Sequence, residues 1–197
     1  MKVSKEQAQQ NKQALLEAAG RLFKQHGVDG VGVADICREA GLTQGALYKH
    51  FTDKQDLVAQ SFERAFRQGF DRITAVPAGQ SPSLDTYLRS YLSRRLRDDL
   101  SAGCPLMATA CETARQSEPV SRNFTSAFVE LRQGLQAVLP TPPDASAEDT
   151  RQQATMAVAA LLGAVALSRG MLKADKDLAD QVLADVQACL TRLQQQA

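Results

Sequence analysis

Residues 43–54 hold the side chains of this chain that are best suited to contact a nucleic acid. Gln44 carries both a donor and an acceptor, as a base edge requires, and adenine is its usual match. Gly45 has no side chain, so the backbone around it can approach a groove closely. Groups that suit phosphate oxygens are present on Thr43, Tyr48, Lys49, His50 and Lys54. The segment therefore predicts contact with double-stranded DNA, although Tyr48 alone could be a packing residue and His50 a helix-end residue.

Two short helices joined by a tight turn are expected to position these side chains. The first is predicted over Val33–Ala40, and Gly41 supplies the residue without a Cβ that a left-handed helix end favours. Thr43 is the expected N-cap of the second helix, which is predicted over residues 44–50 with Leu47 on its inner side. A short helix with one buried anchor and a polar outer face is typical of a helix that lies in the major groove.

A set of residues across this stretch carries a family resemblance: Asp35-Ile36, Ala40-Gly41-Leu42-Thr43, Gly45-Ala46-Leu47-Tyr48, Phe51, Lys54 and Leu57. Their spacing resembles that of the DNA-binding domain of the tetracycline-repressor-like (TetR) regulators, over residues 10–60. Gly32 departs from the pattern, because the family usually has Thr or Ser there to cap the helix. The resemblance implies a three-helix helix-turn-helix domain in which positions 43–45, 48 and 54 touch the operator.

Composition limits the classes of protein to consider. The chain has 197 residues and a net charge of +1, which argues against an indiscriminate nucleic-acid binder. The polar N-terminus predicts no secretory signal, and the apolar run at residues 154–167 is too short to span a bilayer. Four Cys and two His, with no C-x-x-C pair, predict neither a zinc site nor a disulfide framework. We therefore expect a cytoplasmic protein with no metal, cofactor or membrane partner.

The rest of the chain is expected to be helical too. No alternating apolar and polar run predicts a strand, so the fold class is all-α with about nine helices. We expect a DNA-binding domain at residues 1–54 and an effector-binding and dimerisation domain at residues 55–197. The later helices are predicted to start at a Thr52–Gln55 capping box, at Leu84 (running to about Leu100), at Pro105, at Pro119, after Ser146 and at about Asp175.

A cluster of charges lies within the helix predicted from Leu84. Arg94, Arg95 and Arg97 are followed by Asp98 and Asp99. We expect these residues to form a solvated face, because charged side chains are rarely fully buried.

Aromatic side chains recur at helical spacing in the second domain. Phe62, Phe66 and Phe70 lie at i, i+4 and i+8, which suits either a packed core or the wall of a ligand cavity. The cavity interpretation favours a small, mainly apolar effector. Its candidate residues are Phe62, Phe66, Phe70, Tyr87, Tyr91, Met107, Phe124 and Phe128.

The last two predicted helices favour a homodimer. Residues 156–167 are apolar nearly all round and rich in small side chains, so a neighbouring helix can come close. Two such helices that pair with their copies would form a four-helix seam, and the family resemblance implies the same arrangement. The candidate interface residues are Met156, Ala160, Leu161, Ala164, Leu167, Val182, Val186 and Leu190.

Cys104 has two interpretations. It precedes Pro105 at a predicted helix start, where the helix terminus favours the thiolate. The Gly-Cys-Pro-Leu segment resembles a subset of the family, some of whose members sense electrophiles or oxidants, so Cys104 is a candidate redox sensor. The alternative is a small buried residue.

These observations favour a homodimeric repressor that binds a pseudo-palindromic operator and that a small effector releases. The sequence contains no Gly-rich phosphate loop, nucleophile elbow or zinc-protease motif, so we expect no catalytic residues. An enzyme is the alternative from another class. A third interpretation is a DNA-binding or scaffolding homologue without a small-molecule response.

Overall fold

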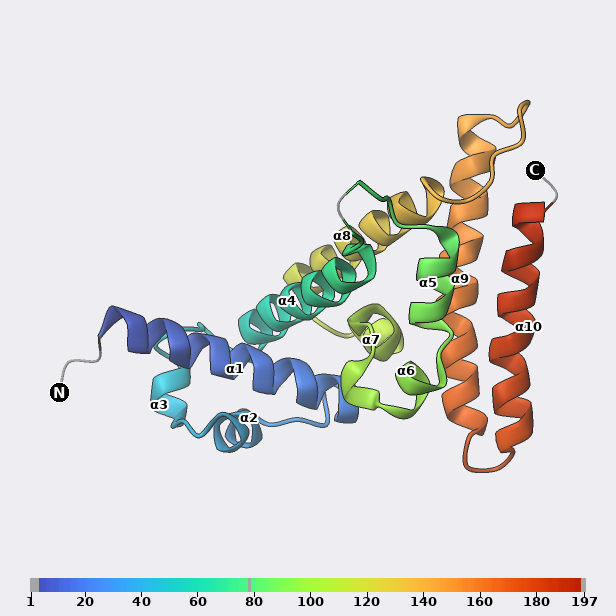
Figure 1. Ribbon diagram of the computed structural model, residues 1–197. Helices are drawn as coiled ribbons and strands as arrows, with labels where there is room; N and C mark the ends of the chain where they lie inside the picture. The colour runs from blue at the N-terminus through green and yellow to red at the C-terminus, as the bar shows by residue number, and fades with distance from the viewer. Residues whose placement is uncertain (1–3, 78, 196–197) are drawn as a thin grey trace. The chain divides into compact units, whose positions relative to one another are not determined.

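Helices make up the regular secondary structure of residues 4–77 and 79–195, the part of the chain that the computed structural model describes (Figure 1). This part contains ten α-helices, one 3-10 helix and no strand, which confirms the all-α fold. The elements are α1 (Lys5–His26), α2 (Val33–Ala40), α3 (Gln44–Leu47), α4 (Lys54–Thr74), α5 (Leu84–Tyr91), α6 (Arg94–Asp98), η1 (Leu100–Ala102), α7 (Pro105–Thr113), α8 (Glu118–Gln136), α9 (Ala147–Met171) and α10 (Lys176–Gln195).

Local signals explain where several helices begin and end. The side chain of Thr43 accepts a hydrogen bond from the Ala46 N–H, which makes Thr43 the N-cap of α3 as predicted. Gly41 ends α2 with a φ of 67°, in the left-handed region that favours glycine. Ser146 caps α9 in the same way as Thr43 caps α3.

Three predicted helix boundaries are wrong. Asp53 caps α4 in place of Thr52, because its carboxylate accepts the Asp56 N–H at 2.9 Å. The helix expected from Leu84 to about Leu100 stops at Tyr91, and Ser93 caps a new helix by accepting the Leu96 N–H. The α-helix at residues 44–50 covers only Gln44–Leu47, and turns continue it to residue 50.

The first compact unit contains residues up to 68 together with residues 104–125. Its apolar core joins Leu15 of α1, Ile36 of α2, Leu47 of α3 and Leu57 of α4 with Val120 of α8. Segments far apart in the sequence therefore share one core. The predicted boundary between residues 54 and 55 divides the chain differently. This division into two domains stays a prediction. Residues 1–3, 78 and 196–197 of these predicted domains lie outside the described chain.

The second compact unit contains residues 69–103 and those from 126 onward. Helices α9 and α10 form an antiparallel pair within it (Figure 1). α9 also contacts α5 and α6, and it buries Ala154, Val158, Leu161 and Val165. These burial patterns follow from its apolar composition, because a helix with little polar surface must pack on several sides.

Length and composition alone would allow α9 to cross a membrane. Its most apolar 18-residue window has a mean hydropathy of 1.5, and it is the one helix of the described chain that reaches this level. The helix has 25 residues and extends beyond the apolar run at 154–167, so the run's shortness does not settle the point. A buried core helix of the same composition passes the same test, so the observation is weak evidence for a membrane span.

Arg97 contradicts the expected solvated face, although Arg94 and Arg95 are exposed. The Arg97 side chain is 1% exposed, and its Nη1 donates to Asp180 Oδ1 of α10 at 2.5 Å. Its Nε donates to Asp98 Oδ1 at 2.7 Å. The Arg97 hydrogen bond also lowers the pKa of Asp180. The sequence concealed this arrangement, because the partner Asp180 lies 83 positions away.

Replacing Arg97 with Met should lower the free energy of unfolding by about 2 kcal/mol, because the half-buried Asp180 loses its hydrogen bond from a fully buried guanidinium. Chemical denaturation monitored by circular dichroism measures the change. Arg94→Met is the matched control, since Arg94 contacts the same Asp180 at 2.8 Å but is 71% exposed. An exposed ion pair contributes little, so equal losses in the two variants would contradict the buried role of Arg97.

Candidate nucleic-acid interface

Helix α3 is short and depends on its neighbours for its position. Leu47 is completely buried in the core of the first unit, and Phe51, just after the helix, is 2% exposed. The Tyr48 N–H donates to the Gln44 carbonyl and the Phe51 N–H to the Leu47 carbonyl, so the turns that follow continue the helical path. An isolated helix of this length would not form in water, so burial of Leu47 and Phe51 must hold it.

The predicted DNA-contacting residues lie together around α3. Thr43, Gln44, Gly45, Tyr48 and Lys49 are exposed, whereas His50 and Lys54 are half-buried. Tyr48 is 54% exposed. A packing role does not explain so exposed an aromatic side chain, and its hydroxyl can reach a phosphate or base.

Lys54 is engaged within the protein. Its Nζ donates to the Val28 carbonyl at 2.7 Å. Sequence reasoning predicted a phosphate contact at this position and missed the internal one, since Val28 lies 26 positions away in a loop.

Helix α2 compensates for the glycine at its start. Gly32 has no side chain to cap the helix, but the Asp35 carboxylate accepts the Gly32 N–H at 3.1 Å. Arg38 also donates to Asp35. These two hydrogen bonds, that from Gly32 first, lower the pKa of Asp35. The missing cap is thus partly replaced by a residue within the first turn.

Lys12 of α1 belongs to the same surface and was missed from the sequence. Its ammonium lies 5.6 Å from the centre of the Phe51 ring, which is the geometry of a cation–π contact. Lys12 is half-buried next to the end of α3. Nothing in the local pattern signals this contact, because Lys12 of α1 and Phe51, which follows α3, are 39 positions apart in the sequence.

Comparisons with known proteins agree with this geometry. A family model described as "Bacterial regulatory proteins, tetR family" matches residues 15–60. A second, "Transcriptional regulator LmrA/YxaF-like, C-terminal domain", matches residues 83–178. The chain belongs to the TetR family.

Relatives and solved structures extend this result. The transcriptional regulator AcrR of Shigella flexneri is 43% identical over 60 residues, which span 30% of this chain and 28% of AcrR. TtgR of Pseudomonas putida is 28% identical over 149 residues, covering 69% of this chain and 67% of TtgR. A TetR-family regulator from Agrobacterium tumefaciens, 22% identical, has the same fold with a TM-score of 0.75, over 94% of this chain and 98% of that one. The chain is therefore a DNA-binding transcriptional regulator and not an enzyme.

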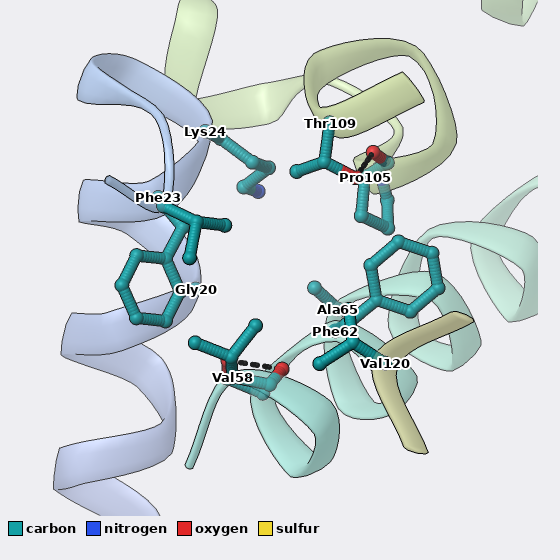
Figure 2. Close-up of a pocket in the computed structure, with 11 residues that line it drawn as sticks. Gly20, Phe23, Lys24, Val58, Phe62, Ala65, Pro105, Thr109 and Val120 are labelled. Carbon is teal, nitrogen blue, oxygen red and sulfur yellow. Dashed lines mark hydrogen bonds between the residues drawn. The ribbon is translucent and has the colours of Figure 1, made fainter. Parts of the chain in front are cut away.

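An apolar cavity lies in the first unit of this TetR-family chain (Figure 2). Phe23 of α1, Phe62 of α4, Pro105 and Thr109 of α7, and Val120 of α8 are among its lining residues. Its volume of about 20 Å³ suits at most a water molecule. Thr109 donates its hydroxyl hydrogen to the Pro105 carbonyl, so this hydroxyl already has an acceptor. The cavity is too small for an effector.

The eight predicted pocket residues are divided between the two units. Phe62, Phe66, Met107 and Phe124 belong to the first, where the rings of Phe62 and Phe124 are 5.9 Å apart. The second contains Phe70, Tyr87, Tyr91 and Phe128. A single effector pocket formed by all eight remains a prediction.

Within the second unit, Tyr87 and Phe70 pack against Gly134 of α8. A Cβ at this glycine would lie only 2.4 Å from the Tyr87 hydroxyl oxygen and 3.3 Å from the Phe70 ring. Tyr87 and Tyr91 are both buried, and burial raises the pKa of Tyr87. Phe128 is half-buried, with the Arg132 guanidinium 5.6 Å from its ring centre. These contacts are those of a packed core.

The predicted dimer residues differ in exposure. Met156 is 71% and Leu167 is 60% exposed, and Ala160, Val182 and Val186 are half-buried. Leu161, Ala164 and Leu190 are buried within the chain itself, so they offer little surface to a partner.

The exposed face of α9 also contains residues that sequence reasoning did not select. Ala159 and Ala166 are exposed, and a Cβ at Gly163 would have no neighbour within 4 Å. Together with Met156 and Leu167, these residues recur at three- and four-residue spacing along one side of the helix. The helical period of the small residues could have identified them.

Cys104 lies at the N-cap of α7 with Pro105 as the first helical residue, as predicted, and it is half-buried. Cys111, near the end of the same helix, is exposed. The redox-sensing role of Cys104 stays a prediction. In the described residues, no group of three or more His, Cys, Asp or Glu could hold a metal ion.

Gly45→Ala tests whether the backbone of α3 closely approaches DNA, because the substitution should weaken operator binding without lowering stability. A Cβ at this exposed position would meet only Thr43 Oγ1, at an ordinary 3.9 Å, and alanine favours a helix by about 1 kcal/mol over glycine. We expect unchanged or higher thermal stability and operator affinity reduced by about tenfold or more, measured by fluorescence anisotropy. Unchanged affinity would show that the backbone at Gly45 does not closely approach the groove.

Proposed function

We propose that this TetR-family regulator is a homodimeric, cytoplasmic repressor that binds a pseudo-palindromic operator through α3 and is released by a small, mainly apolar effector. The observation that carries the proposal is the outward face of α3. Gln44, Gly45 and Tyr48 are exposed there on a helix anchored by the fully buried Leu47. Gln44 would contact a base edge, and Thr43, Tyr48, Lys49 and His50 would contact the phosphate backbone.

A second copy is needed because one short helix reads only a few base pairs. The exposed face of α9 supports a dimer, since Met156 and Leu167 are exposed on it and the residues between them on this face are small. We assign Met156, Ala160 and Leu167 of α9 to this interface, with Val182 and Val186 of α10. Leu161, Ala164 and Leu190 are left out, because they are already buried.

Release by an effector would follow if the ligand favours a state in which the two α3 helices have the wrong spacing for the operator. A ligand shifts such an equilibrium only by its difference in affinity for the two states. Helix α4 suits the transmission of this change, because it begins beside α3 and continues to Thr74. The effector-binding domain remains assigned to residues 55–197.

Selection of bound DNA from a random pool tests the operator proposal. We expect an enriched pseudo-palindrome with half-sites about one helical turn apart or a multiple of it. Gln44→Ala should relax the preference at one position of each half-site, at a cost of about 1–3 kcal/mol. Tyr48→Phe tests the hydroxyl contact, and we expect it to weaken binding.

The selection should be repeated with a set of hydrophobic compounds, of which at least one should release the DNA. Sequence preference and affinity that survive both substitutions would contradict the proposed reading face. A protein that answers to no compound would favour a regulator without a small-molecule response.

Met156→Glu and Leu167→Glu test the dimer. Each places a charge on the exposed face of α9, so a dimer seated there should dissociate, because desolvating an unpaired charge is costly. Size-exclusion chromatography with light scattering measures the mass. Ala184→Glu is the control, since Ala184 is exposed on α10 and lies on the opposite side of that helix from Val182 and Val186. Variants that remain dimeric would place the interface elsewhere.

A further inference from the structure

Val28, in the loop between α1 and α2, is held from two sides through its backbone. Its N–H donates to the Glu112 carboxylate of α7 at 2.7 Å. Its carbonyl accepts from the Lys54 ammonium, at the start of α4, at 2.7 Å. Its side chain is 2% exposed in the core of the first unit. One residue thus joins α7 and α4 immediately before the helix-turn-helix.

Gly27 makes this contact with Glu112 possible. Its φ of 77° lies in the region that favours glycine. A Cβ at this position would lie 2.2 Å from Glu112 Oε1, far inside any permitted contact. The loop is therefore shaped around the Glu112 carboxylate.

A second set of contacts joins the same three segments. Gln116 donates its amide hydrogen to Asp29 Oδ1 at 3.0 Å. Gln55, in the first turn of α4, donates to Gln116 Oε1 at 2.9 Å and accepts the Ser117 N–H at 3.2 Å. The hydrogen bond from Gln116 is the largest cause of the lowered pKa of Asp29, and the charges of Arg115 and Lys54 add to it.

These contacts hold both ends of the helix-turn-helix. Residues 28 and 29 precede α2, and Lys54 and Gln55 follow α3. Residues 112–117, at the junction between α7 and α8, contact the segment at each end through Glu112 and Gln116. The α7–α8 junction thus fixes the segment from α2 to α3 at both of its ends. A movement of α3 that shifts either end of this segment strains these hydrogen bonds.

We propose that Lys54, Glu112 and Gln116 are positioning residues that set the angle of α3, so that the α7–α8 junction is part of the DNA-reading unit. This inference rests on the proposed operator binding. It assigns Lys54 a role different from the phosphate contact predicted from sequence. The operator affinity of the protein then depends on Glu112, which lies 65 positions after Leu47, the last residue of α3.

Salt dependence separates positioning from phosphate contact. Each phosphate contact adds about 0.9 to the slope of log affinity against log salt. We expect Lys54→Met and Glu112→Ala to reduce operator affinity by about tenfold, with an unchanged slope and unchanged binding to random duplex. Glu112→Gln should recover most of the loss, because its amide oxygen still accepts the Val28 N–H. Lys49→Met is the comparison for a true phosphate contact, and it should lower the slope by about 0.9 and weaken both kinds of DNA alike.

Three outcomes would overturn the proposal. The first is a slope reduced by about 0.9 in Lys54→Met, with equal losses on operator and random duplex. The second is wild-type behaviour of both Lys54→Met and Glu112→Ala. The third applies if Glu112→Ala melts below the assay temperature: Gln116→Ala then replaces it, and wild-type operator affinity in this variant would contradict the inference.

Hydrogen exchange keeps this test separate from the proposed function. If the wild-type protein binds no duplex selectively, the operator proposal fails, but the positioning role of Lys54, Glu112 and Gln116 can still be tested. Amide exchange of residues 33–51 is then compared between Glu112→Ala and the wild type. Faster exchange in these helices supports the positioning role, and unchanged exchange overturns it.

Discussion

Burial of Leu47 is the interaction on which the proposed DNA-reading surface depends. A four-residue helix has no stability of its own in water, because the cost of nucleation exceeds what so few hydrogen bonds return. The core formed by Leu15, Ile36, Leu47 and Leu57 supplies the missing free energy. It fixes the side of α3 that faces inward, and by the helical period it directs Gly45 and Tyr48 outward. Gln44, at the start of the helix, is also exposed. The exposure of the proposed DNA-contacting side chains thus follows from an apolar contact.

In the second unit, apolar packing and the hydrogen bonds of two arginines act together. α9 is apolar over most of its length, so its packing against α5 and α10 needs little specificity beyond shape. The buried Arg97 adds direction to this packing, since its guanidinium must meet Asp180 of α10 in one geometry to offset its loss of water. Arg169 of α9 donates to the carbonyls of Leu96 and Arg97, which ties α6 to the same helix. Apolar burial supplies the free energy, and the two arginines specify the register.

Local features of the chain were predictable where the cause was local. Thr43 and Gly41 were identified as helix boundaries, because a side-chain acceptor and a missing Cβ act within one turn. The exposure of Tyr48 and burial of Leu47 followed from the helical period. Asp53 was missed as the cap of α4, since Thr52 and Asp53 are both good caps and the sequence does not rank them. The end of α5 at Tyr91 was also missed, because a serine such as Ser93 can either continue a helix or cap the next one.

By itself, the sequence determined the all-helical fold, the position of the short helix α3 and the family, because periodicity, caps and motif spacing involve only a few neighbouring residues. Only the tertiary structure decided that Arg97 is buried, that Lys54 and Glu112 meet at Val28, and that Leu161, Ala164 and Leu190 face inward. Each of these depends on which distant segment supplies the partner. The local sequence around a charged or apolar side chain is the same whether that side chain faces water, a core or a second chain. Its burial distinguishes these cases, and burial is a property of the folded molecule.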